Sequence, residues 1–403
     1  MSMTDRAVRE QYDALPYPAR DPRDEAKRLV VGSPSHLAEV EHWLGTGDAA
    51  QPWRVLVAGG GTGDASVMLA QQAARAGRAV EIVHLEPSAA ARSIAAARLD
   101  ARGLTSVRLV EGTIEALPSL GLGVFDYIDC CGVLHHLADP ATGLAALATV
   151  LAPTGGMGVM VYGRFGRTGV YEIQAALAQL VPPGPPAQRV AAARRVMAGL
   201  PASHPFRLNR QVGDHLVSDA GFYDLLLHPR DRAYDVAELL AVVAGAGLAP
   251  VTMMEPVRYD PTSWLNHPEP KRQAAALPLA EQWALAERLS GAMPRHVVYV
   301  ARPGATAPVA VSEAAVPRWR DLCPPGLAAD LARGSLTLDD GVVRLQLVAP
   351  RGASAVVSRL DGQRSIAAIA ADLPMRDAVA VTLETVRLLI ACNLVLLRRG
   401  AGS

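Results

Sequence analysis

The chain of 403 residues has no excess of charge of either sign, because its 39 Lys and Arg balance its 39 Asp and Glu. Proteins that bind a phosphate backbone usually carry a basic excess or a basic patch, so this balance predicts no nucleic-acid partner. The chain also lacks an uninterrupted apolar run of the roughly 20 residues that a membrane span requires. We therefore predict no membrane partner either.

Cysteine is scarce, with four residues at positions 130, 131, 323 and 392. Two are adjacent and two are isolated, a spacing that matches neither a disulfide framework nor a metal site, so no metal is predicted. Residues 1–25 are rich in charge and lack the apolar core of a signal peptide, which favours a cytoplasmic location. Abundant alanine and arginine with little lysine are typical of a GC-rich bacterial source.

Half of the residues are apolar, which is ample for a large core and allows two or three domains. The most informative segment is an aliphatic run that breaks into glycines, Val55-Leu56-Val57-Ala58-Gly59-Gly60-Gly61-Thr62-Gly63. This pattern predicts a buried strand that ends in a tight turn, with a helix beginning near Asp64. Glycine permits the backbone angles of such a turn and lets a ligand approach the main chain.

The glycine spacing distinguishes between cofactors. A dinucleotide-binding turn needs glycine at its first, third and sixth places, but the sixth place counted from Gly59 is Asp64. Nicotinamide and flavin cofactors are therefore disfavoured. Glycines at alternate places instead resemble the first motif of class I S-adenosylmethionine-dependent methyltransferases. The resemblance implies S-adenosylmethionine as the cofactor, held at Ala58, Gly59, Gly61 and Gly63.

Three further apolar segments, at residues 79–86, 107–112 and 124–131, predict three more strands. The first ends in Glu86, where an α/β nucleotide-binding protein places a carboxylate that accepts from ribose hydroxyls. Such an acid also occurs as a helix cap, so its place after the glycine turn is what favours the ribose. By resemblance, Thr113 and Ile114 hold the adenine. The string from Gly132 to His136, Gly-Val-Leu-His-His, resembles the fourth motif of the family and places Gly132 at the cofactor.

Two positions depart from the family pattern. Many members carry an acid at the position of Val57 and an aspartate at that of Thr113. Valine cannot bond the amino group of the methionine half, so backbone carbonyls near Ala58 and Gly59 are expected to serve. The Thr113 hydroxyl can still accept from the adenine amino group, although more weakly than a charged acceptor. These departures concern the affinity for the cofactor and not its identity.

Alternating strands and helices from residue 54 to about 163 predict an α/β, Rossmann-like methyltransferase sheet with ligands at the carboxyl ends of parallel strands. A fifth strand is expected at 156–162, after the breaker at 153–155. A helix at 235–246, capped by Asp235, and strands at 248–254 and 295–302 complete the core. The predicted regions are an N-terminal lid or arm at 1–50, the cofactor-binding core at 51–164, a helical cap at 165–232, the end of the core at 233–302, a linker at 303–316 and a small α+β domain at 317–403.

The cap begins with a helix near Tyr171 and continues with an arginine- and alanine-rich helix after residue 186. An insertion at this point of the sheet hangs over the acceptor entrance, so we interpret it as shaping acceptor specificity or making a homodimer. In the C-terminal domain, a strand at 342–348 and a helix at 377–393 are expected. The string at 360–366, Leu-Asp-Gly-Gln-Arg-Ser-Ile, resembles that of winged-helix accessory domains, some of which hold peptides. A structural or dimerising appendage is the alternative.

The N-terminal segment contains Tyr12, Tyr17 and Arg20 among several prolines. Proline reduces the entropy lost when a loop becomes ordered, and tyrosine offers a flat surface with a hydroxyl. The segment resembles the lid that some bacterial methyltransferases fold over the cofactor. That resemblance implies that the two tyrosines pack the methionine end and that Arg20 meets its carboxylate. Alternatively, the segment is an arm strapped to the back of the core.

Methyl transfer from a sulfonium needs alignment and water exclusion more than acid–base chemistry. A base is needed only when the acceptor arrives protonated, as a lysine does at neutral pH. We predict His135, Tyr162 and His228 as base or acceptor clamp, with His136 and Asp231 as further candidates. Adjacent histidines cannot both face one site from a regular element, so at most one of the pair contacts the reactants. Roles in capping or packing remain the alternative.

Together, the arm, the Gly-Val-Leu-His-His string, the cap and the tail resemble a group of bacterial methyltransferases that includes lysine methyltransferases acting on outer-membrane proteins. Three functions stay open. The chain methylates a protein side chain such as lysine, or it methylates a small molecule at nitrogen or oxygen, or it binds the cofactor without catalysis as a scaffold. The intact glycine turn and Glu86 argue against the third function.

Overall fold

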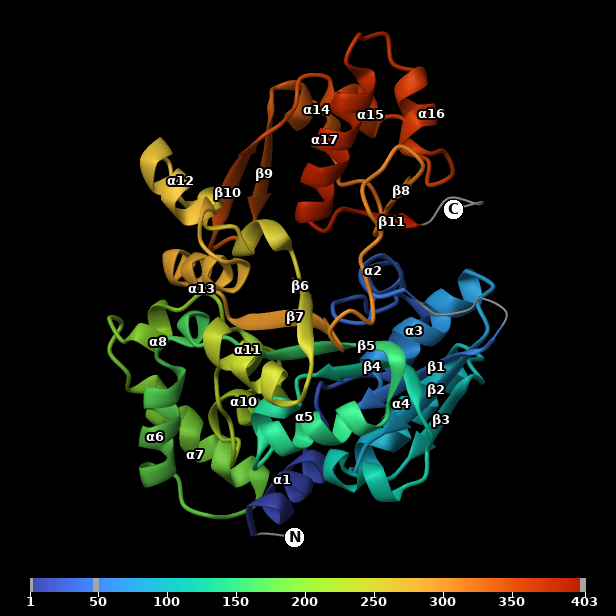
Figure 1. The fold of residues 1–403 in the computed structure, drawn as a ribbon. Helices are drawn as coiled ribbons and strands as arrows, with labels where there is room; N and C mark the ends of the chain where they lie inside the picture. The colour runs from blue at the N-terminus through green and yellow to red at the C-terminus, as the bar shows by residue number, and fades with distance from the viewer. Residues whose placement is uncertain (1–2, 46–50, 399–403) are drawn as a thin grey trace. The chain divides into compact units, whose positions relative to one another are not determined.

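A computed structural model describes residues 3–45 and 51–398 of the chain (Figure 1). These residues fall into two compact units. The first combines the described parts of 1–36, 46–250 and 292–305, and the second combines those of 37–45, 251–291 and 306–403. The sequence analysis assigns residues 251–291 to the end of the cofactor-binding core, whereas most of their contacts are with the C-terminal unit. Each unit is therefore assembled from segments that are distant in the sequence.

A seven-stranded sheet has the strand order β3-β2-β1-β4-β5-β7-β6. Its strands are β1 (Trp53–Ala58), β2 (Val80–Leu85), β3 (Val107–Val110), β4 (Phe125–Cys131), β5 (Leu151–Tyr162), β6 (Ala249–Met253) and β7 (Arg295–Ala301). The pairs among β1 to β5 are parallel, as the alternating pattern predicts, whereas β7 pairs antiparallel with β5. The strand order reverses between β1 and β4, and a crevice forms at such a switch point.

Helices connect the strands of this sheet at the places that the sequence predicts. They are α3 (Asp64–Arg75), α4 (Ala89–Ala101), α5 (Pro140–Thr149) and α11 (Val236–Gly245), with the short 3₁₀ helices η2 (Ile114–Ser119), η3 (Leu134–His136) and η4 (Phe165–Arg167). The predicted cap of α11 is confirmed, because the Asp235 side chain accepts from the Glu238 N–H within a capping box. The Ser88 hydroxyl caps α4 by accepting from the Ala91 N–H.

Strand β5 differs from the sequence expectation at its start. The Pro153-Thr154-Gly155 breaker was expected to precede the strand, but β5 already begins at Leu151, which pairs with Phe125 of β4. The register between β4 and β5 shifts between Phe125 and Tyr127. A local irregularity of this kind lets a strand continue past residues that interrupt regular pairing.

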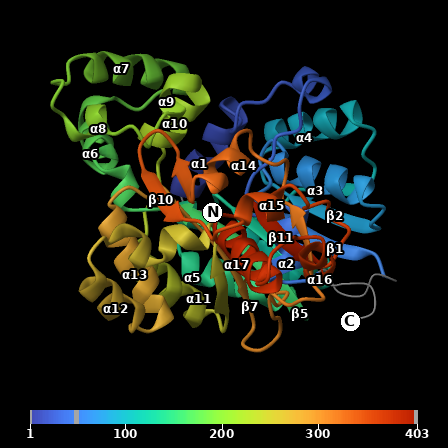
Figure 2. The ribbon, with the colours of Figure 1, turned by 90° about the horizontal axis from the view of Figure 1, so that it is seen from above.

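The cap is a helical insertion between β5 and α11, and its helices gather together in Figures 1 and 2. They are α6 (Val170–Leu180), α7 (Pro186–Ala198), α8 (Pro205–Leu208), α9 (Asp214–Val217) and α10 (Asp219–Leu226). The two predicted cap helices are confirmed as α6 and α7. Buried residues such as Ile173, Val190 and Phe222 give the cap its own core, against which Leu15 of the N-terminal segment packs.

The N-terminal segment forms helix α1 (Met3–Ala14), an extended stretch and the 3₁₀ helix η1 (Pro22–Ala26). The sequence analysis predicts a proline-rich lid here and no helix. Tyr12 lies on the last turn of α1, whereas Tyr17 and Arg20 follow the helix. The Asp13 side chain accepts from the Ser88 hydroxyl at 2.7 Å, so the helix is fastened to the edge of the sheet.

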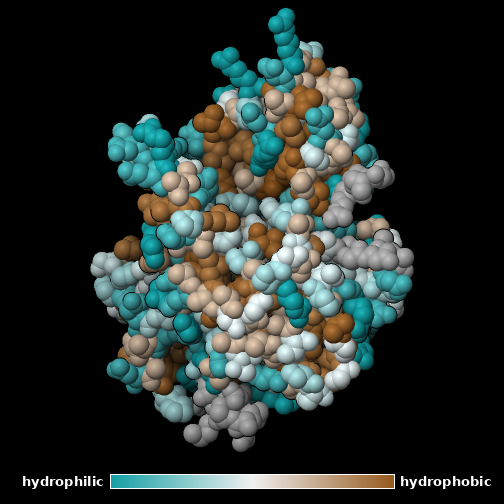
Figure 3. Space-filling view, in the orientation of Figure 1, coloured by the Kyte–Doolittle hydropathy of each residue, from teal (hydrophilic) through white to brown (hydrophobic). Residues whose placement is uncertain are grey.

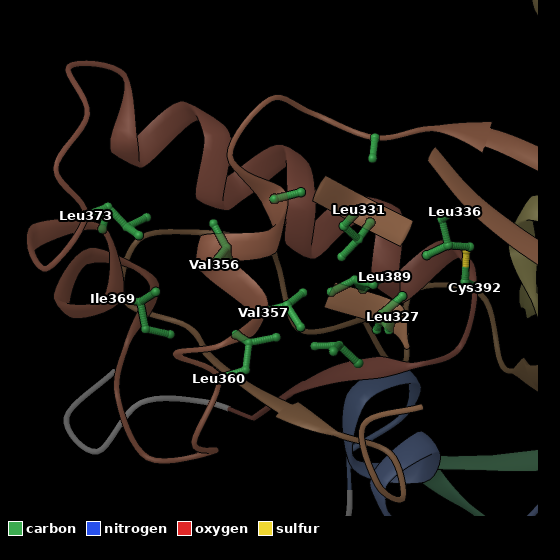
Figure 4. Packing of buried hydrophobic residues seen from close by; sticks show 14 of the residues in the cluster. Leu327, Leu331, Leu336, Val356, Val357, Leu360, Ile369, Leu373, Leu389 and Cys392 are labelled. Atoms are coloured by element: carbon green, nitrogen blue, oxygen red, sulfur yellow. The ribbon is translucent and has the colours of Figure 1, made fainter. Parts of the chain in front are cut away.

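The second unit contains two antiparallel strand pairs with helices between them. The pairs are β8 (Val316–Trp319) with β11 (Val395–Arg398), and β9 (Ser335–Asp339) with β10 (Arg344–Val348). Its helices are α2 (Leu37–Trp43), η5 (Pro256–Tyr259), η6 (Pro261–Trp264), α12 (Pro268–Ala275), α13 (Leu279–Ser290), α14 (Leu327–Ala332), α15 (Ala353–Val357), α16 (Ile366–Ala371) and α17 (Ala378–Ala391). The core between these helices contains Leu331, Val356 and Leu389 (Figure 4). The α+β composition matches the prediction for the C-terminal domain, and the winged-helix likeness stays a prediction.

Polar and apolar residues alternate over the face of the molecule that Figure 3 presents. The exposed apolar side chains of the chain include Leu216 and Val217 in the cap and Leu322 and Val348 in the second unit. Among the described residues, no helix combines the length and the apolar character that crossing a membrane demands.

Candidate active site

A cavity of about 910 Å³ lies within the first unit, at the carboxyl ends of β1 to β5. The glycine turn after β1, the residues that follow the next three strands, the N-terminal segment and the cap all contribute to its wall. Its volume falls within the range of typical ligand pockets. Most of the predicted site residues line it, namely Tyr12, Tyr17, Arg20, Gly59, Gly61, Glu86, Thr113, Ile114, Gly132 and Tyr162.

The glycine turn exposes bare main chain to this cavity. Gly59 and Gly61 have φ values of +68° and +54°, a region that side chains rarely adopt. A Cβ atom at Gly59 would lie 2.6 Å from Val133 Cγ2, and one at Gly61 would lie 2.9 Å from the carbonyl oxygen of Tyr17. Ala58 and Gly63 do not line the cavity. Gly63, with φ +98°, begins α3 and packs against Ala95, so its role is in the turn itself.

Glu86 stands beside the glycine turn at the end of β2. Its Oε2 accepts from the Gly61 N–H at 3.0 Å, and its Oε1 accepts from the Ser88 N–H at 2.8 Å. Burial raises the pKa of this carboxyl, while the two backbone donors lower it. Each carboxylate oxygen has a second lone pair, so Glu86 is still able to accept from ribose hydroxyls.

Thr113 and Ile114 lie at the start of η2, on the wall of the same cavity. The Thr113 side chain makes no capping hydrogen bond to the helix, so its hydroxyl is not committed there. Ile114 is buried and gives this wall an apolar surface. A hydroxyl next to an apolar side chain suits a flat heterocycle with a polar edge.

The N-terminal segment crosses the glycine turn. The Thr62 hydroxyl donates to the Pro18 carbonyl at 2.7 Å. Arg20 donates to both oxygens of Asp64, through Nε at 2.8 Å and Nη2 at 2.6 Å. The sequence analysis predicts that Arg20 meets the cofactor carboxylate, but its guanidinium is paired with Asp64, which also pairs with Arg98. Arg20 thus fastens the segment to the first turn of α3.

A second group of polar side chains is centred on Asp224, a buried residue of α10 that lines the cavity. The Tyr12 hydroxyl donates to its Oδ1 at 3.1 Å, and the Tyr162 hydroxyl donates to its Oδ2 at 3.0 Å. His136 Nε2 lies 4.0 Å from Oδ1. Burial raises the pKa of Asp224 and also the pKa values of both tyrosines. The cap, the N-terminal helix and the sheet therefore meet at one carboxylate.

Hydrogen bonds locate protons on the two histidines. His136 Nδ1 lies 2.8 Å from the carbonyl oxygen of Arg230, which only accepts, so Nδ1 carries a proton. His228 Nδ1 accepts from the Arg230 N–H at 3.0 Å, so its proton is on Nε2 and donates to the Tyr12 hydroxyl at 3.3 Å. Burial lowers the pKa of His228 well below its usual value, in agreement with a neutral ring.

Of the three predicted catalytic residues, only Tyr162 lines the cavity. His135 is buried behind Tyr162, with ring centroids 3.9 Å apart, and neither of its nitrogens has a hydrogen-bond partner among the described residues. His136 lines the cavity in its place. Only one of the two adjacent histidines lines the cavity, as expected for neighbouring residues of a regular element. His228 does not line the cavity, but it forms a hydrogen bond with Tyr12, which does.

Sequence reasoning missed Asp224 and Arg167. Asp224 is a single acidic residue within a mostly apolar helix, and nothing in the local sequence distinguishes it as a site residue. Arg167 stacks over Tyr162, with its Cζ 3.7 Å from the ring centroid, and donates to Asp231 at 2.7 Å. Asp231, a candidate base from the sequence, is thereby committed to Arg167 and to Gln174. The roles of Asp224 and Arg167 both depend on contacts between β5, η4 and the cap.

His136, Asp224 and His228 also place one ligand atom each within 4.8 Å of the others, a spacing that suits a metal ion. The tautomers disfavour this use. With Nδ1 of His228 accepting from a backbone N–H, a metal at Nε2 would require a ring without any proton. The cluster is better described as a hydrogen-bond chain from His228 through Tyr12 to Asp224.

Residues 56–157 match the family model described as a methyltransferase domain. The chain contains a class I methyltransferase domain. The predicted methyltransferase domain, its Rossmann-like sheet and S-adenosylmethionine as its cofactor are thereby confirmed.

Solved structures extend the likeness beyond this methyltransferase domain. PKMT2 from Rickettsia typhi in complex with AdoHcy superposes with a TM-score of 0.62 over 91% of this chain and 75% of that protein, at 12% identity. A second structure of PKMT2 gives a TM-score of 0.60 at 13% identity. At such identities the likeness concerns the fold alone.

The likeness also extends to sequence. An uncharacterized protein from Synechococcus is 32% identical over 263 residues, which are 64% of this chain and 61% of that protein. The chain thus spans about three fifths of the length of this relative.

Proposed function

We propose that the whole chain transfers a methyl group from S-adenosylmethionine to an amine nitrogen, with the lysine side chain of a protein as the favoured acceptor. The observation that carries this proposal is the group of acceptor atoms at the cavity wall. The Asp224 carboxylate and Nε2 of His136 lie 4.0 Å apart. A lysine ammonium must lose a proton before its nitrogen can attack, and these are groups that attract and deprotonate a cation.

The cofactor half of the site fits S-adenosylmethionine. Main chain at Gly59 and Gly61 allows close approach of a ligand, and Glu86, Thr113 and Ile114 line the same cavity. We assign Glu86 to the ribose hydroxyls and Thr113 with Ile114 to the adenine. When bound, the cofactor supplies an activated methyl group. The residues of the chain align the acceptor with that group and exclude water.

His136 is the proposed base, in place of the His135 predicted from sequence. The carbonyl oxygen of Arg230 accepts from Nδ1 of His136, and Nε2 lies on the side of Asp224 in a ring that lines the cavity. When Nε2 takes the acceptor proton, the ring becomes a cation 4.0 Å from Asp224 Oδ1. The carboxylate, held by the hydroxyls of Tyr12 and Tyr162, stabilises that cation.

The preference for a protein acceptor has a second support. It is the sequence resemblance to a group of bacterial methyltransferases that includes lysine methyltransferases, while the fold likeness to PKMT2 extends over 91% of this chain and so includes regions outside the methyltransferase domain. A small-molecule amine or hydroxyl is the alternative acceptor, since a cavity of about 910 Å³ also has room for one. A cytoplasmic location, a bacterial source and a homodimer remain predictions.

Incubation of the purified chain with a tritiated methyl donor and host lysate tests the proposal. Label retained above a small-cutoff filter and recovered as methyl-lysine after acid hydrolysis supports it, whereas label in the filtrate favours a small-molecule acceptor. Absence of label in both fractions, with cofactor binding intact by calorimetry, would identify a non-catalytic scaffold. The His136→Gln variant is the matched control for label that does not depend on the site.

A further inference from the structure

Val57 leaves the cofactor site without the acid that many methyltransferases carry at the end of the first strand. In the sheet, Val57 of β1 is the register partner of Asp129 of β4. Paired residues of adjacent parallel strands lie about 4.8 Å apart, and their side chains emerge on the same face of the sheet. Both residues line the cavity. A carboxylate is therefore present one strand away from the position where the family pattern expects one.

Neutral polar groups surround the side chain of Asp129 and hold it in place. Its Oδ2 accepts from the Ser35 hydroxyl, whose oxygen lies 2.9 Å from the hydroxyl of Tyr127. The Ser35 N–H in turn donates to the hydroxyl of Tyr299 at 3.2 Å. Gly158 makes room for this arrangement, because a Cβ there would lie 2.3 Å from the Tyr127 oxygen.

Asp129 is only 2% exposed, and among residues 3–45 and 51–398 no cationic side chain forms an ion pair with it. A buried carboxylate is costly unless a cation or several donors compensate its charge. Burial accordingly raises the pKa of the Asp129 carboxyl to about 7. A ligand that brings a positive group into the cavity would supply the missing compensation.

We propose that Asp129 receives the α-ammonium group of the methionine half of the cofactor, in place of the acid absent at position 57. The proposal rests on the proposed function, because it assumes that S-adenosylmethionine occupies this cavity. Gly132, which closes β4 on the cavity wall, places main chain next to the same position. Ser35 and Tyr127 are positioning residues that orient the carboxylate. The carbonyls near Ala58 and Gly59, expected from sequence to serve alone, then act beside a charged acceptor.

Calorimetric titration with two ligands tests this assignment. AdoHcy carries the amino acid half of the cofactor, whereas 5′-methylthioadenosine lacks it and keeps the nucleoside. We expect Asp129→Asn to weaken AdoHcy binding at least tenfold and to leave methylthioadenosine binding within twofold. Unchanged AdoHcy affinity, or an equal loss for both ligands, would overturn the assignment. Failure of the wild-type chain to bind either ligand would refute the cofactor site itself, so the two failures are distinguishable.

Proton release provides a second readout. Binding of an ammonium group to Asp129 requires the ionised carboxyl, so the wild-type chain should release a proton when AdoHcy binds at a pH below 7, and Asp129→Asn should not. The other titratable groups near the carboxyl are Tyr127, Tyr299, Cys131 and His36, together with His84 on β2. Burial raises the pKa of Cys131 well above its usual value and lowers the pKa of His84 to about 4. His36→Gln is the control, and release abolished by that variant rather than by Asp129→Asn would contradict the proposal.

Discussion

His135 and His136 are neighbours in the chain and nevertheless have different surroundings. His135 is enclosed behind Tyr162, and burial lowers its pKa well below the usual value. His136 lines the cavity, with its Nδ1 proton held by the Arg230 carbonyl and its Nε2 directed toward Asp224. Which of the two histidines can serve as the proposed base therefore depends on the side of the short 3₁₀ helix η3 from which its ring projects.

We expect His136→Gln to lower kcat about 100-fold, which is the lower range of what a positioned general base contributes. The variant should bind AdoHcy as the wild-type chain does, because the cofactor half of the site is untouched. Steady-state kinetics with the identified acceptor measure this change. His135→Gln is the matched control, and an equal loss of kcat in both variants would contradict the assignment of the base to His136.

Asp129 gives the stability of the cofactor-free chain a dependence on pH. Its pKa of about 7 lies above the roughly 3.9 of an exposed aspartate, so the folded chain keeps a proton that the unfolded chain has released. This carboxyl therefore stabilises the fold at low pH, and the contribution is lost as the pH rises through about 7. Urea unfolding at several pH values should show a smaller fall in the free energy of unfolding for Asp129→Asn than for the wild-type chain. An unchanged slope would be evidence against the raised pKa, and the exposed Asp100→Asn serves as control.

At the scale of elements, the turn between β1 and α3 brings the N-terminal segment and the cofactor cavity together. Thr62 binds the Pro18 carbonyl, and Arg20 binds Asp64 on the first turn of α3. From the sequence, glycine is expected here because it lets a ligand approach the main chain. In the structure, the first atom that a side chain at Gly61 would meet is the carbonyl oxygen of Tyr17.

Gly61→Val should therefore displace the N-terminal segment and weaken AdoHcy binding at least 100-fold by calorimetry. The reason is twofold, since φ is +54° and the added Cβ would lie 2.9 Å from a backbone atom. Gly77→Val is a matched control with φ +64° and no atom within 4 Å of the added Cβ. It should lose some stability and keep its affinity. Equal losses of affinity in both variants would mean that backbone strain, and not the contact with Tyr17, is responsible.

On the scale of the whole molecule, both units draw on distant parts of the chain. Helix α2 lies between the N-terminal segment and β1 in sequence, yet it belongs to the C-terminal unit. Its Glu39 accepts from Arg320 at 2.5 Å and from Asn393 at 2.8 Å, and Glu41 pairs with Arg318. The small domain predicted at 317–403 is thus completed by an N-terminal helix.

Arg320→Met should lower the free energy of unfolding by about 3–5 kcal/mol, because it removes a cation from the side chain of Glu39, which is 0% exposed. Urea denaturation followed by circular dichroism measures the change. Arg333→Met is the matched control, since Arg333 pairs with Asp330 at an exposed site and should change the stability by less than about 1 kcal/mol. Similar losses in the two variants would contradict a special role for the buried pair.

Much of the first unit follows from local pattern. The strands that end at Ala58, Leu85 and Cys131 and the cap at Asp235 are recognisable because apolar periodicity, glycine and capping residues act within a few residues of one another. The start of β5 and helix α1, which carries Tyr12, were not predicted. In the first case pairing with β4 outweighs a proline and a glycine, and in the second a helical segment is hidden among polar residues and followed by prolines.

The amino-acid sequence by itself determined the methyltransferase domain, the parallel part of the sheet and the glycine turn with Glu86 beside it, because those features depend on the order of residues along single strands and turns. The tertiary structure alone decided that Asp224 joins Tyr12 and Tyr162, that His136 rather than His135 faces the cavity, and that Asp129 lies beside Val57. Those relations join residues up to 212 positions apart, and only the packing of the cap and the strand register brings them together.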